Sequence, residues 1–281
     1  MTSPTWVRCP VVIPWYGGKF ELSKKLVPML PSHERYFEVF AGGLSMFFRK
    51  NKCHWNVVND LDNDVVNLYI SVVEEFEAFK EFVYWYPRSR ALFLKIKDEI
   101  KQGKEIEMPD PRRAARYFYV IRTAFNKNPY GSFSKSPKKD WGTKLIEELK
   151  YSRSYFDGVT IENLDFRELL KRYPPRDVDL WYMDPPYVVA GERGDYYVHD
   201  FTNEDHEGIL EVCNEIDAAG GKFMVSYDDR NRIRELFSNY NVGEVTTKYA
   251  GNLSKRNTVI KELVITNYTS PTYQESIFKE N

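Results

Sequence analysis

The sequence predicts an α/β protein in which a Rossmann-like sheet is interrupted by an inserted, mostly helical segment. Short apolar strands near both ends of the chain each run into a turn that contains glycine, an acidic residue or proline, which is the pattern of a doubly wound sheet. Between these strands, apolar residues recur at spacings of three and four, which predicts packed helices. A chain of 281 residues is long enough for one large domain that carries such an insertion.

Composition narrows the class of protein. Hydrophobic residues make up 42% and aromatic residues 16% of the chain, which argues against disorder, and no apolar run reaches the length of a membrane span. Residues 1–9 lack the basic start and the long apolar stretch of a signal peptide, so we expect a cytoplasmic protein with no membrane contact. The three cysteines are far apart, which predicts reduced thiols, and the four histidines do not combine with them at metal-ligand spacings, so no metal site is expected.

The first expected strand, residues 11–13, leads into the run WYGGK at residues 15–19 and then into a helix over Phe20–Leu30. Two glycines ahead of a helix let the backbone approach a ligand closely, and the free amides at a helix start attract an anion such as a carboxylate. Lys19 adds a positive charge at this point. A plain glycine turn is the alternative interpretation.

A second strand, Tyr36–Phe40, is followed by the turn AGGLS at residues 41–45 and by an expected helix over Met46–Asn51. Strand, glycine turn and helix open a nucleotide-binding sheet, but adjacent glycines do not match the spaced dinucleotide pattern, so NAD is not predicted. The next strand, Trp55–Val58, ends at Asn59 and Asp60. An acidic residue there is placed to bind a ribose diol, which makes Asp60 the candidate, with Asp62 as a weaker neighbour that caps the next helix instead.

The inserted segment begins with a long helical pattern. Apolar residues from Val65 to Ile100, Trp85 and Leu94 among them, have the spacing of a bundle core. Asp110 and Pro111 are a cap and a first-turn proline, which predicts a helix over Arg112–Phe125.

Residues 126–142 follow this helix and read as a hairpin or loop, rich in Gly, Pro, Asn and Ser, with interleaved lysines and with Tyr130, Phe133 and Trp141 as candidate wedges or stacking faces for nucleic acid. From Asp110 to Arg153 the sequence holds eleven basic and four acidic residues, in a chain whose net charge is −1. This local excess predicts a surface that faces phosphates. A flexible surface loop and a solvated helix face are the alternative interpretations.

The sheet resumes with Val159–Ile161, after which Asp165 is placed to accept a hydrogen bond from an adenine amine, with Phe166 against the ring. The strand Val178–Met183 then delivers DPPY at residues 184–187, where two prolines end the strand. A carboxylate, a backbone carbonyl and an aromatic face are thereby held together. An exocyclic aromatic amine needs such acceptors and such a ring, although a tight turn is the simpler interpretation of this tetrapeptide alone.

The rest of the chain completes the sheet. Thr202 and Asp205 have the spacing of a capping box for a helix that ends near Ala219. A strand is expected over Lys222–Tyr227, and a closing antiparallel pair over residues 242–249 and 259–268.

Taken in order, the runs at residues 15–19, 37–45, 59–60, 165–166, 184–187 and 261–268 resemble the Dam-like (D12 class, alpha group) DNA adenine-specific methyltransferases, over nearly the whole chain. The resemblance implies an S-adenosylmethionine-dependent methyltransferase sheet at residues 1–70 and 155–281, and an inserted DNA target-recognition domain at residues 71–154. It also implies transfer of a methyl group to the N6 amine of an adenine flipped out of double-stranded DNA. A cognate restriction endonuclease is a possible partner.

The resemblance assigns roles to individual residues. The catalytic set is Asp184, Pro185, Pro186 and Tyr187. The residues implied to contact S-adenosylmethionine are Trp15, Tyr16, Gly17, Gly18, Lys19, Phe40, Gly42, Gly43, Ser45, Asp60, Asp165, Phe166 and Asp184. The implied DNA contacts are Arg122, Asn126, Lys127, Tyr130, Ser132, Lys135, Lys138 and Lys139. Gly131, Ser132 and Phe133 resemble the family hairpin, but the rest of the segment 127–141 departs from it. No recognition sequence is therefore carried over.

Three other functions are compatible with parts of this pattern. The nearest is methylation of an exocyclic amine in RNA or of a glutamine amide in protein. A catalytically silent DNA-binding module and a structural α/β protein are more distant. The aspartate at the first position of the tetrapeptide and the basic inserted segment favour DNA adenine.

Overall fold

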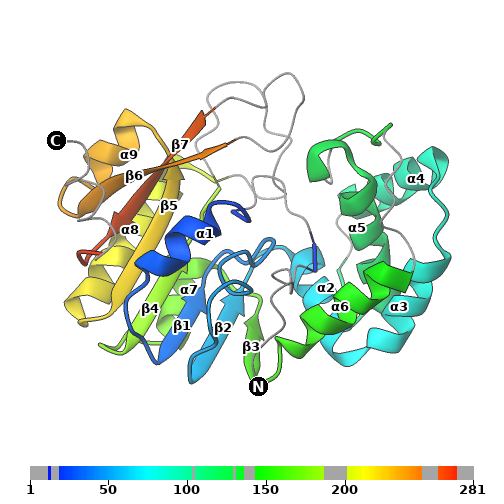
Figure 1. Ribbon diagram of the computed structural model, residues 1–281, viewed down its shortest axis with the longest axis horizontal. Helices are drawn as coiled ribbons and strands as arrows, with labels where there is room; N and C mark the ends of the chain where they lie inside the picture. The colour runs from blue at the N-terminus through cyan, green and yellow to red at the C-terminus, as the bar shows by residue number, and fades with distance from the viewer. Residues whose placement is uncertain are drawn as a thin grey trace. The chain divides into compact units, whose positions relative to one another are not determined.

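The computed structural model describes residues 12–13, 19–102, 105–128, 131–135, 143–186, 201–248 and 259–270 (Figure 1). Several predicted site residues lie outside these ranges, namely Trp15, Tyr16, Gly17, Gly18, Tyr130, Lys138, Lys139 and Tyr187. The described residues group into two compact units. A helical unit contains residues 12–13, 42–51 and the described part of 63–159, and a sheet unit contains residues 19–41, 52–62 and the described residues from 160 onward. The role of residues 71–154 in target recognition stays a prediction.

The sheet unit is built on a seven-stranded sheet with the order β3-β2-β1-β4-β5-β7-β6 (Figure 1). The strands are β1 (Arg35–Glu38), β2 (Trp55–Asn59), β3 (Val159–Glu162), β4 (Asp179–Met183), β5 (Lys222–Asp228), β6 (Asn241–Lys248) and β7 (Val259–Thr266). β1 pairs in parallel with β2 and β4, β4 pairs in parallel with β5, and β7 is antiparallel to both β5 and β6. The first five strands follow the doubly wound order, so the predicted Rossmann-like α/β fold is confirmed.

Register places the ends of the parallel strands at one edge. Glu38, the last residue of β1, pairs with Val58 and with Tyr182, and Met183, the last residue of β4, pairs with Val225. The residues that follow β1, β2 and β4 therefore leave the sheet on the same side, where ligands of open α/β sheets bind.

The core of the sheet unit is formed by aromatic and branched side chains. The rings of Phe37 and Trp181, on neighbouring strands, stack with centroids 3.9 Å apart. They share a buried cluster with the helices α7 (Phe166–Arg172), α8 (Asn203–Ala218) and α9 (Asn231–Leu236). The predicted capping box at the start of α8 is confirmed, because Thr202 and Asp205 each bind the other's backbone amide.

Two short helices expected near the N-terminus are wrong in extent or in kind. Residues 20–30 form only α1 (Ser23–Leu26) and the 3₁₀ helix η1 (Val27–Met29), because Pro28 has no amide hydrogen to continue an α-helix. Residues 45–49 form turns and not a helix, since this segment is too short to nucleate one and its buried aromatic side chains decide its path. Val12 and Ile13 are buried in a bend and not in a strand.

The helical unit packs around one central helix, α5. Its helices are α2 (Asn63–Glu74), α3 (Phe76–Trp85), α4 (Arg90–Lys101), α5 (Pro111–Thr123) and α6 (Thr143–Ser154), with the 3₁₀ helix η2 (Phe125–Lys127) after α5. α5 contacts α2, α3 and α4. The side chain of Asp110 accepts a hydrogen bond from the amide of Arg113 at 2.9 Å, which confirms the predicted cap.

Two residues expected in the bundle core are exposed. Trp85 is 72% exposed because it is the last residue of α3, and Leu94 is 50% exposed because it lies off the buried stripe of Phe93, Ile96 and Ile100 on α4. None of the described helices is long and apolar enough to span a membrane.

Candidate functional site

The predicted tetrapeptide begins at the end of the buried strand β4. Asp184, Pro185 and Pro186 directly follow Met183, and the strand stops where the prolines were expected to stop it. Each strand that flanks β4 is paired with it in parallel, so the position of Asp184 is set by backbone hydrogen bonds on both sides. Tyr187, the fourth residue, lies outside the described residues.

The carboxylate of Asp184 is held through one of its oxygens. Its Oδ1 lies 3.2 Å from the ammonium nitrogen of Lys19 and accepts a hydrogen bond of 3.2 Å from the hydroxyl of Ser226. Lys19 precedes α1, and Ser226 lies on β5. The same ammonium group also forms an ion pair with Glu262, which lies on β7. Four segments far apart in the sequence thus meet at this edge of the sheet unit.

Burial controls the charges in this cluster. Burial raises the pKa of Asp184 to about 6, and the negative charge of Glu262 adds to this effect, while Lys19 acts in the opposite direction. Burial also raises the pKa of Glu262, against the effect of Lys19. Burial alone favours the neutral amine of Lys19, but Asp184 and Glu262 together raise the pKa of this side chain above its usual value. The cluster therefore places the amine of Lys19 between two carboxyl groups, and its ion pairs with both favour the charged form of that amine.

A hydrogen-bonded tyrosine supports Ser226. The hydroxyl oxygens of Tyr182 and Ser226 are 2.9 Å apart. Because the single hydroxyl hydrogen of Ser226 is donated to Asp184, Tyr182 is the donor in this second bond. Burial raises the pKa of Tyr182 well above its usual value, so its phenol keeps the hydrogen that it donates.

Asn59 joins the strand ends on the other side of β1. Its side-chain amide donates to the carbonyl oxygens of Val39 and Leu164, both at 3.0 Å, and its carbonyl oxygen accepts from the amide of Leu164 at 2.9 Å. Asn59 is itself buried. It therefore ties the end of β1 to the segment that follows β3, and so positions Asp60 and Asp165 at the same edge.

The candidate ribose and adenine residues occupy this edge. Asp60 directly follows β2, and its Oδ1 accepts a hydrogen bond of 3.0 Å from the amide of Asp62. Asp165 caps α7, since its Oδ1 accepts from the amide of Arg167 at 2.9 Å. Asp165 therefore has a structural role that was not predicted from the sequence, and about a third of its side chain remains exposed.

Three phenylalanines form an apolar surface beside Asp165. The ring of Phe166 lies 5.9 Å from the ring of Phe40 and 6.1 Å from that of Phe201, and Phe40 and Phe201 are 6.0 Å apart. Phe201 was not predicted from the sequence, because nothing in its local pattern separates it from a loop residue.

The glycine turn of the predicted cofactor set belongs to the helical unit. Gly42 has a φ angle of 43°, a conformation that glycine adopts without strain, and its carbonyl oxygen accepts a hydrogen bond from the hydroxyl of Tyr69. Gly43 and Ser45 lie in the same turn region. The described geometry thus explains why glycine stands at position 42.

The segment after α5 forms a hairpin in its described part. Ala124 and Phe133 make an antiparallel bridge, and the amide of Phe125 donates to the carbonyl of Ser132 at 2.7 Å. Among the predicted DNA contacts, Ser132 and Lys135 are exposed and Lys127 is half-buried with a φ angle of 62°. Arg122 is in the last turn of α5, with its guanidinium 5.5 Å from the ring of Phe118. The backbone of Asn126 lies in η2, and its side chain lies outside the part that the structure describes.

Phe133, a candidate stacking face for nucleic acid, is half-buried against α4, and its role toward DNA stays a prediction. Its ring packs at 5.5 Å from Phe93 of α4, and the guanidinium groups of Arg88 and Arg90 lie 4.7 Å and 5.5 Å from it. Lys97 of α4 also donates a hydrogen bond of 2.7 Å to the carbonyl of Gly131. The hairpin is therefore anchored on α4, because the arginines and Phe93 enclose an aromatic ring that would otherwise be exposed.

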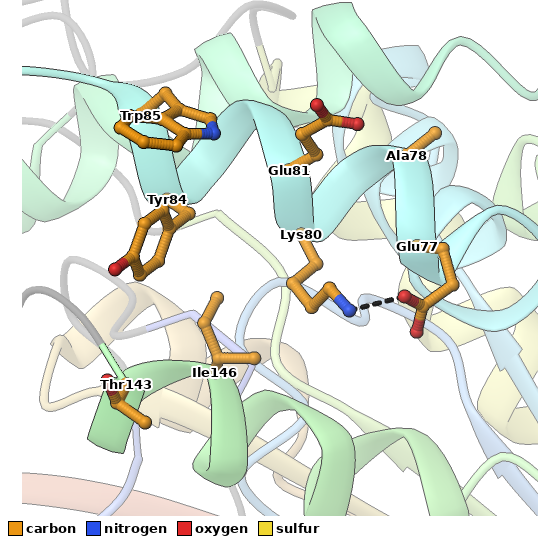
Figure 2. A pocket seen from close by; sticks show the side chains of 8 residues that line it. All are labelled: Glu77, Ala78, Lys80, Glu81, Tyr84, Trp85, Thr143 and Ile146. Carbon is orange, nitrogen blue, oxygen red and sulfur yellow. Dashed lines mark hydrogen bonds and ion pairs between the residues drawn. The ribbon is translucent and has the colours of Figure 1, made fainter.

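A pocket of about 640 Å³ lies within the helical unit, lined by residues of α3 and α6 (Figure 2). Tyr84 and Trp85 of α3 form one side, Ile146 of α6 lies opposite, and Lys80 forms an ion pair with Glu77. None of the sequence-predicted site residues lines this pocket.

Comparison with known proteins decides the family. The family model described as D12 class N6 adenine-specific DNA methyltransferase matches residues 15–250. The chain belongs to this family. The D12 match runs through both units and includes the tetrapeptide, the glycine turn and the hairpin.

Named relatives agree with the D12 assignment. The type II methyltransferase M1.LlaDCHI of Lactococcus lactis subsp. cremoris is 28% identical, over 90% of this chain and 94% of its own. The retron Ec67 DNA adenine methylase of Escherichia coli is 25% identical, over 82% of this chain and 81% of its own. A DNA adenine methylase of Escherichia coli is 22% identical, over 79% of this chain and 82% of its own. The D12 protein described here is thus a DNA adenine methyltransferase.

Two residues of the cluster around Asp184 had no predicted role. Ser226 stands in an expected strand, and Glu262 stands in the closing run that resembles the family. Glu262 is 4% exposed and precedes three buried apolar residues, Leu263, Val264 and Ile265. A carboxylate beside such an apolar run is the one sequence signal that points to a buried charge in need of a partner.

Proposed function

We propose that this D12 methyltransferase uses S-adenosylmethionine as its methyl donor and acts on an adenine that is flipped out of duplex DNA, with Asp184 as the acceptor that orients the reacting amine. The observation that carries this proposal is a carboxylate held by Lys19 and Ser226 at the carboxyl edge of a parallel sheet. Flipping an adenine costs a few kcal/mol of stacking and pairing, which contacts in the enzyme offset.

The sheet edge has donor and acceptor chemistry that suits S-adenosylmethionine. The carboxylates of Asp60 and Asp165 are acceptors for ribose hydroxyls and for an adenine amine, and Phe40 and Phe166 provide an apolar face for the adenine ring. By resemblance, Lys19 and the turn at Gly42 and Gly43 hold the methionine end, together with the motif at residues 15–18. When bound, S-adenosylmethionine supplies a methyl group on a positively charged sulfur.

Asp184 orients the target amine. The unprotonated carboxylate of Asp184 and the backbone carbonyl of Pro185 accept the two hydrogens of the exocyclic amine, so that its lone pair points toward the methyl donor. Because the leaving group already carries a positive charge, positioning and charge complementarity provide most of the catalysis. Tyr187 stacks on the flipped base, as the family resemblance implies.

The DNA surface is proposed to include the hairpin after α5. Arg122, Lys127 and Lys135 supply positive charge there, and the anchoring of Phe133 on α4 gives the hairpin a defined shape. Contacts of this kind with phosphates position a protein on the duplex without reading its sequence.

The first experiment is sequencing that detects modified bases in the genome of a methylation-deficient host. The host expresses the wild-type chain or Asp184→Ala in parallel, and both proteins are checked for solubility and for S-adenosylmethionine binding by calorimetry. We expect methylated adenine in one short sequence context with the wild type and none with Asp184→Ala. Equal methylation by both proteins would remove Asp184 from the mechanism, and a wild type without modified adenine would overturn the proposed reaction.

Base flipping is tested separately. A duplex with 2-aminopurine at the target position brightens when the base leaves the stack, so we expect a fluorescence rise on adding wild-type protein. No rise with a duplex that the enzyme methylates would contradict flipping.

A cognate restriction endonuclease is proposed as a partner because one relative is named a type II methyltransferase. Genomic DNA from the expressing host should then resist an endonuclease with the methylated context as its site. We also propose a cytoplasmic location, because the substrate is DNA.

A further inference from the structure

The two contacts of the protein with the Asp184 carboxylate fall on the same atom. Both the ammonium of Lys19 and the hydroxyl of Ser226 approach Oδ1, each at 3.2 Å. Within the described part of the chain, no polar group is bonded to Oδ2, and 22% of this side chain is exposed. One oxygen is therefore used by the protein, and the other is left for a ligand.

The difference between the two oxygens of Asp184 affects how the carboxylate can bind an incoming amine. A carboxylate oxygen that already accepts two hydrogen bonds is a poorer acceptor than one that accepts none, and a carboxylate free to rotate would not present a fixed direction. Contacts that hold Oδ1 fix the plane of the carboxylate. Oδ2 therefore has a fixed direction, toward the site of the adenine amine, before the substrate binds. Preorganisation of this kind removes a cost from the reaction step.

Lys19 does not hold its position alone. A lysine ammonium sits on a flexible four-carbon stem, so a single contact with Asp184 would leave it mobile. Glu262 binds the same ammonium from β7, and its own place is set by the antiparallel ladder with β5, in which Glu262 pairs with Asp228. The side chains of Lys19 and Glu262 are each only 6% exposed, so water screens this ion pair weakly.

Ser226 is fixed in a comparable way. It lies inside β5, it is fully buried, and its hydroxyl receives the hydrogen of Tyr182 at 2.9 Å. With that hydrogen bond in place, the only direction left for the Ser226 hydrogen is toward Asp184.

We propose that Glu262 and Ser226 are positioning residues of methyl transfer: acting through Lys19 and directly, they clamp Oδ1 of Asp184 so that Oδ2 faces the adenine amine. The inference rests on the proposed role of Asp184 and adds to it residues that do not touch the substrate.

The two residues have opposite electrostatic effects on Asp184, and this makes the proposal testable. The negative charge of Glu262 raises the pKa of Asp184, whereas the hydrogen bond from Ser226 lowers it. In the described part of the chain, the titratable groups that interact electrostatically with this carboxylate are Lys19 before α1, Glu262 on β7, Tyr182 on β4 and Tyr227 on β5. Tyr36 and Glu38 on β1 act on Tyr182, and Asp228 on β5 acts on Glu262. Burial raises the pKa values of the three tyrosines and keeps them neutral through the acid range, so Glu262 and Lys19 are the charged groups that act directly on Asp184 there.

The experiment measures the single-turnover rate constant of methyl transfer from pH 5 to pH 8, with enzyme in excess over a duplex that the wild type methylates. The variants are Glu262→Gln and Ser226→Ala. The matched control is Glu244→Gln, which neutralises a more exposed carboxylate on β6, where it pairs with Arg234 and Lys261. Affinity for S-adenosylmethionine is measured by calorimetry on each protein.

We expect both variants to lose about tenfold or more in the rate constant at saturating S-adenosylmethionine, because a small displacement of a reacting group is enough for such a loss. Ser226→Ala should bind S-adenosylmethionine within about threefold of the wild type, whereas Glu262→Gln should bind it more weakly, because Glu262 holds Lys19. The acid limb of the pH profile should move to lower pH in Glu262→Gln and to higher pH in Ser226→Ala. Glu244→Gln should match the wild type in rate and profile. A merely structural role does not predict displacements of opposite sign.

The outcomes separate this inference from the proposed function. A wild type that does not methylate DNA overturns the proposed function. An active wild type whose rate and acid limb are unchanged in Glu262→Gln or in Ser226→Ala overturns the clamp alone. If Glu262→Gln does not fold, as judged by circular dichroism, the comparison of Ser226→Ala with the wild type decides.

Discussion

Strand β4 begins with one aspartate and is followed directly by another, and the protein treats the two carboxylates differently. At the start of the strand, both oxygens of Asp179 are occupied. Arg35 donates to Oδ1 and to Oδ2, each at 2.6 Å, and the amide of Arg176 and the indole of Trp181 also donate to Oδ2. At the other end, the described contacts with Asp184 reach only Oδ1.

The difference separates a carboxylate that stabilises the fold from one that can bind a substrate. Asp179 has an inaccessible side chain and a bidentate partner, so it has no acceptor left to offer. Asp184 keeps an open oxygen at the edge of the sheet where ligands bind, and burial raises its pKa to about 6. The same residue type on the same strand thus serves stability at one end and, we propose, catalysis at the other.

The largest effect on methyl transfer is expected from a change at Asp184, which follows β4. Asp184→Asn keeps the size of the side chain but loses the charge and one acceptor, so methyl transfer should fall by about a thousandfold. Thermal unfolding should show a folded protein. Asp229→Asn, at a half-buried ion pair with Arg234 after β5, is the control and should keep full activity. Activity within tenfold of the wild type in Asp184→Asn would show that Asp184 does not have the catalytic role that distinguishes it from Asp179.

A change at the start of β4, where Arg35 binds Asp179, should lower stability and leave the rate of methyl transfer unchanged. Arg35→Met removes the partner of a buried carboxylate, and the charge left behind should lower the free energy of unfolding by about 3–5 kcal/mol. Urea denaturation measures this loss. The fraction that remains folded should methylate DNA at the wild-type rate, because Arg35 lies at the edge of the sheet away from Asp184. A stability loss below 1 kcal/mol would show that the pair contributes little.

The pH dependence of stability sharpens the same comparison. The folded protein binds the proton of Asp184 more tightly than the unfolded chain, whose carboxyl has its usual pKa near 4. This contribution to stability is therefore complete below about pH 4 and is lost as the pH rises to about 6. Relative to the wild type, Asp184→Asn should gain about 2 kcal/mol between pH 4 and pH 7, less than the full shift implies because part of the carboxylate is exposed.

That gain is read from urea denaturation of both proteins at pH 4, 5, 6 and 7. A constant difference between them across this series would mean that Asp184 titrates as it does in the unfolded chain. The wild-type rate of methyl transfer should also fall below about pH 6, because a protonated Asp184 accepts less well.

The smallest effect is expected far from both ends of β4, in the hairpin. Lys135→Ala removes one exposed charge from a flexible side chain, so affinity for duplex DNA should fall only severalfold, and the slope of log affinity against log salt should decrease by about one unit. Fluorescence anisotropy at several salt concentrations measures both. An unchanged slope would place Lys135 outside the DNA surface.

Phe133→Ala tests the anchoring of that hairpin. Loss of the ring removes the contacts with Phe93 and with Arg88, so DNA affinity should fall more than in Lys135→Ala although no charge is lost. Equal affinities of Phe133→Ala and the wild type would show that the packing on α4 does not shape the DNA surface.

Several features followed from the sequence because their causes are local. The prolines after Asp184 end a strand wherever they occur, the Asp110 cap and the Thr202 capping box act within one helical turn, and short apolar runs that end in turns predict the strands of a sheet. The order of the motifs was sufficient to predict the α/β fold and the family.

Other features depended on the tertiary structure. Lys19 and Glu262 are 243 residues apart, and only the antiparallel pairing of β7 with β5 brings them together. The exposure of Trp85 and the enclosure of Phe133 likewise depend on which helix packs where. The sequence by itself determined which chemical groups stand at the strand ends, because backbone preferences are local. Tertiary structure decided which oxygen of Asp184 the protein occupies, because that depends on long-range pairing of buried charges.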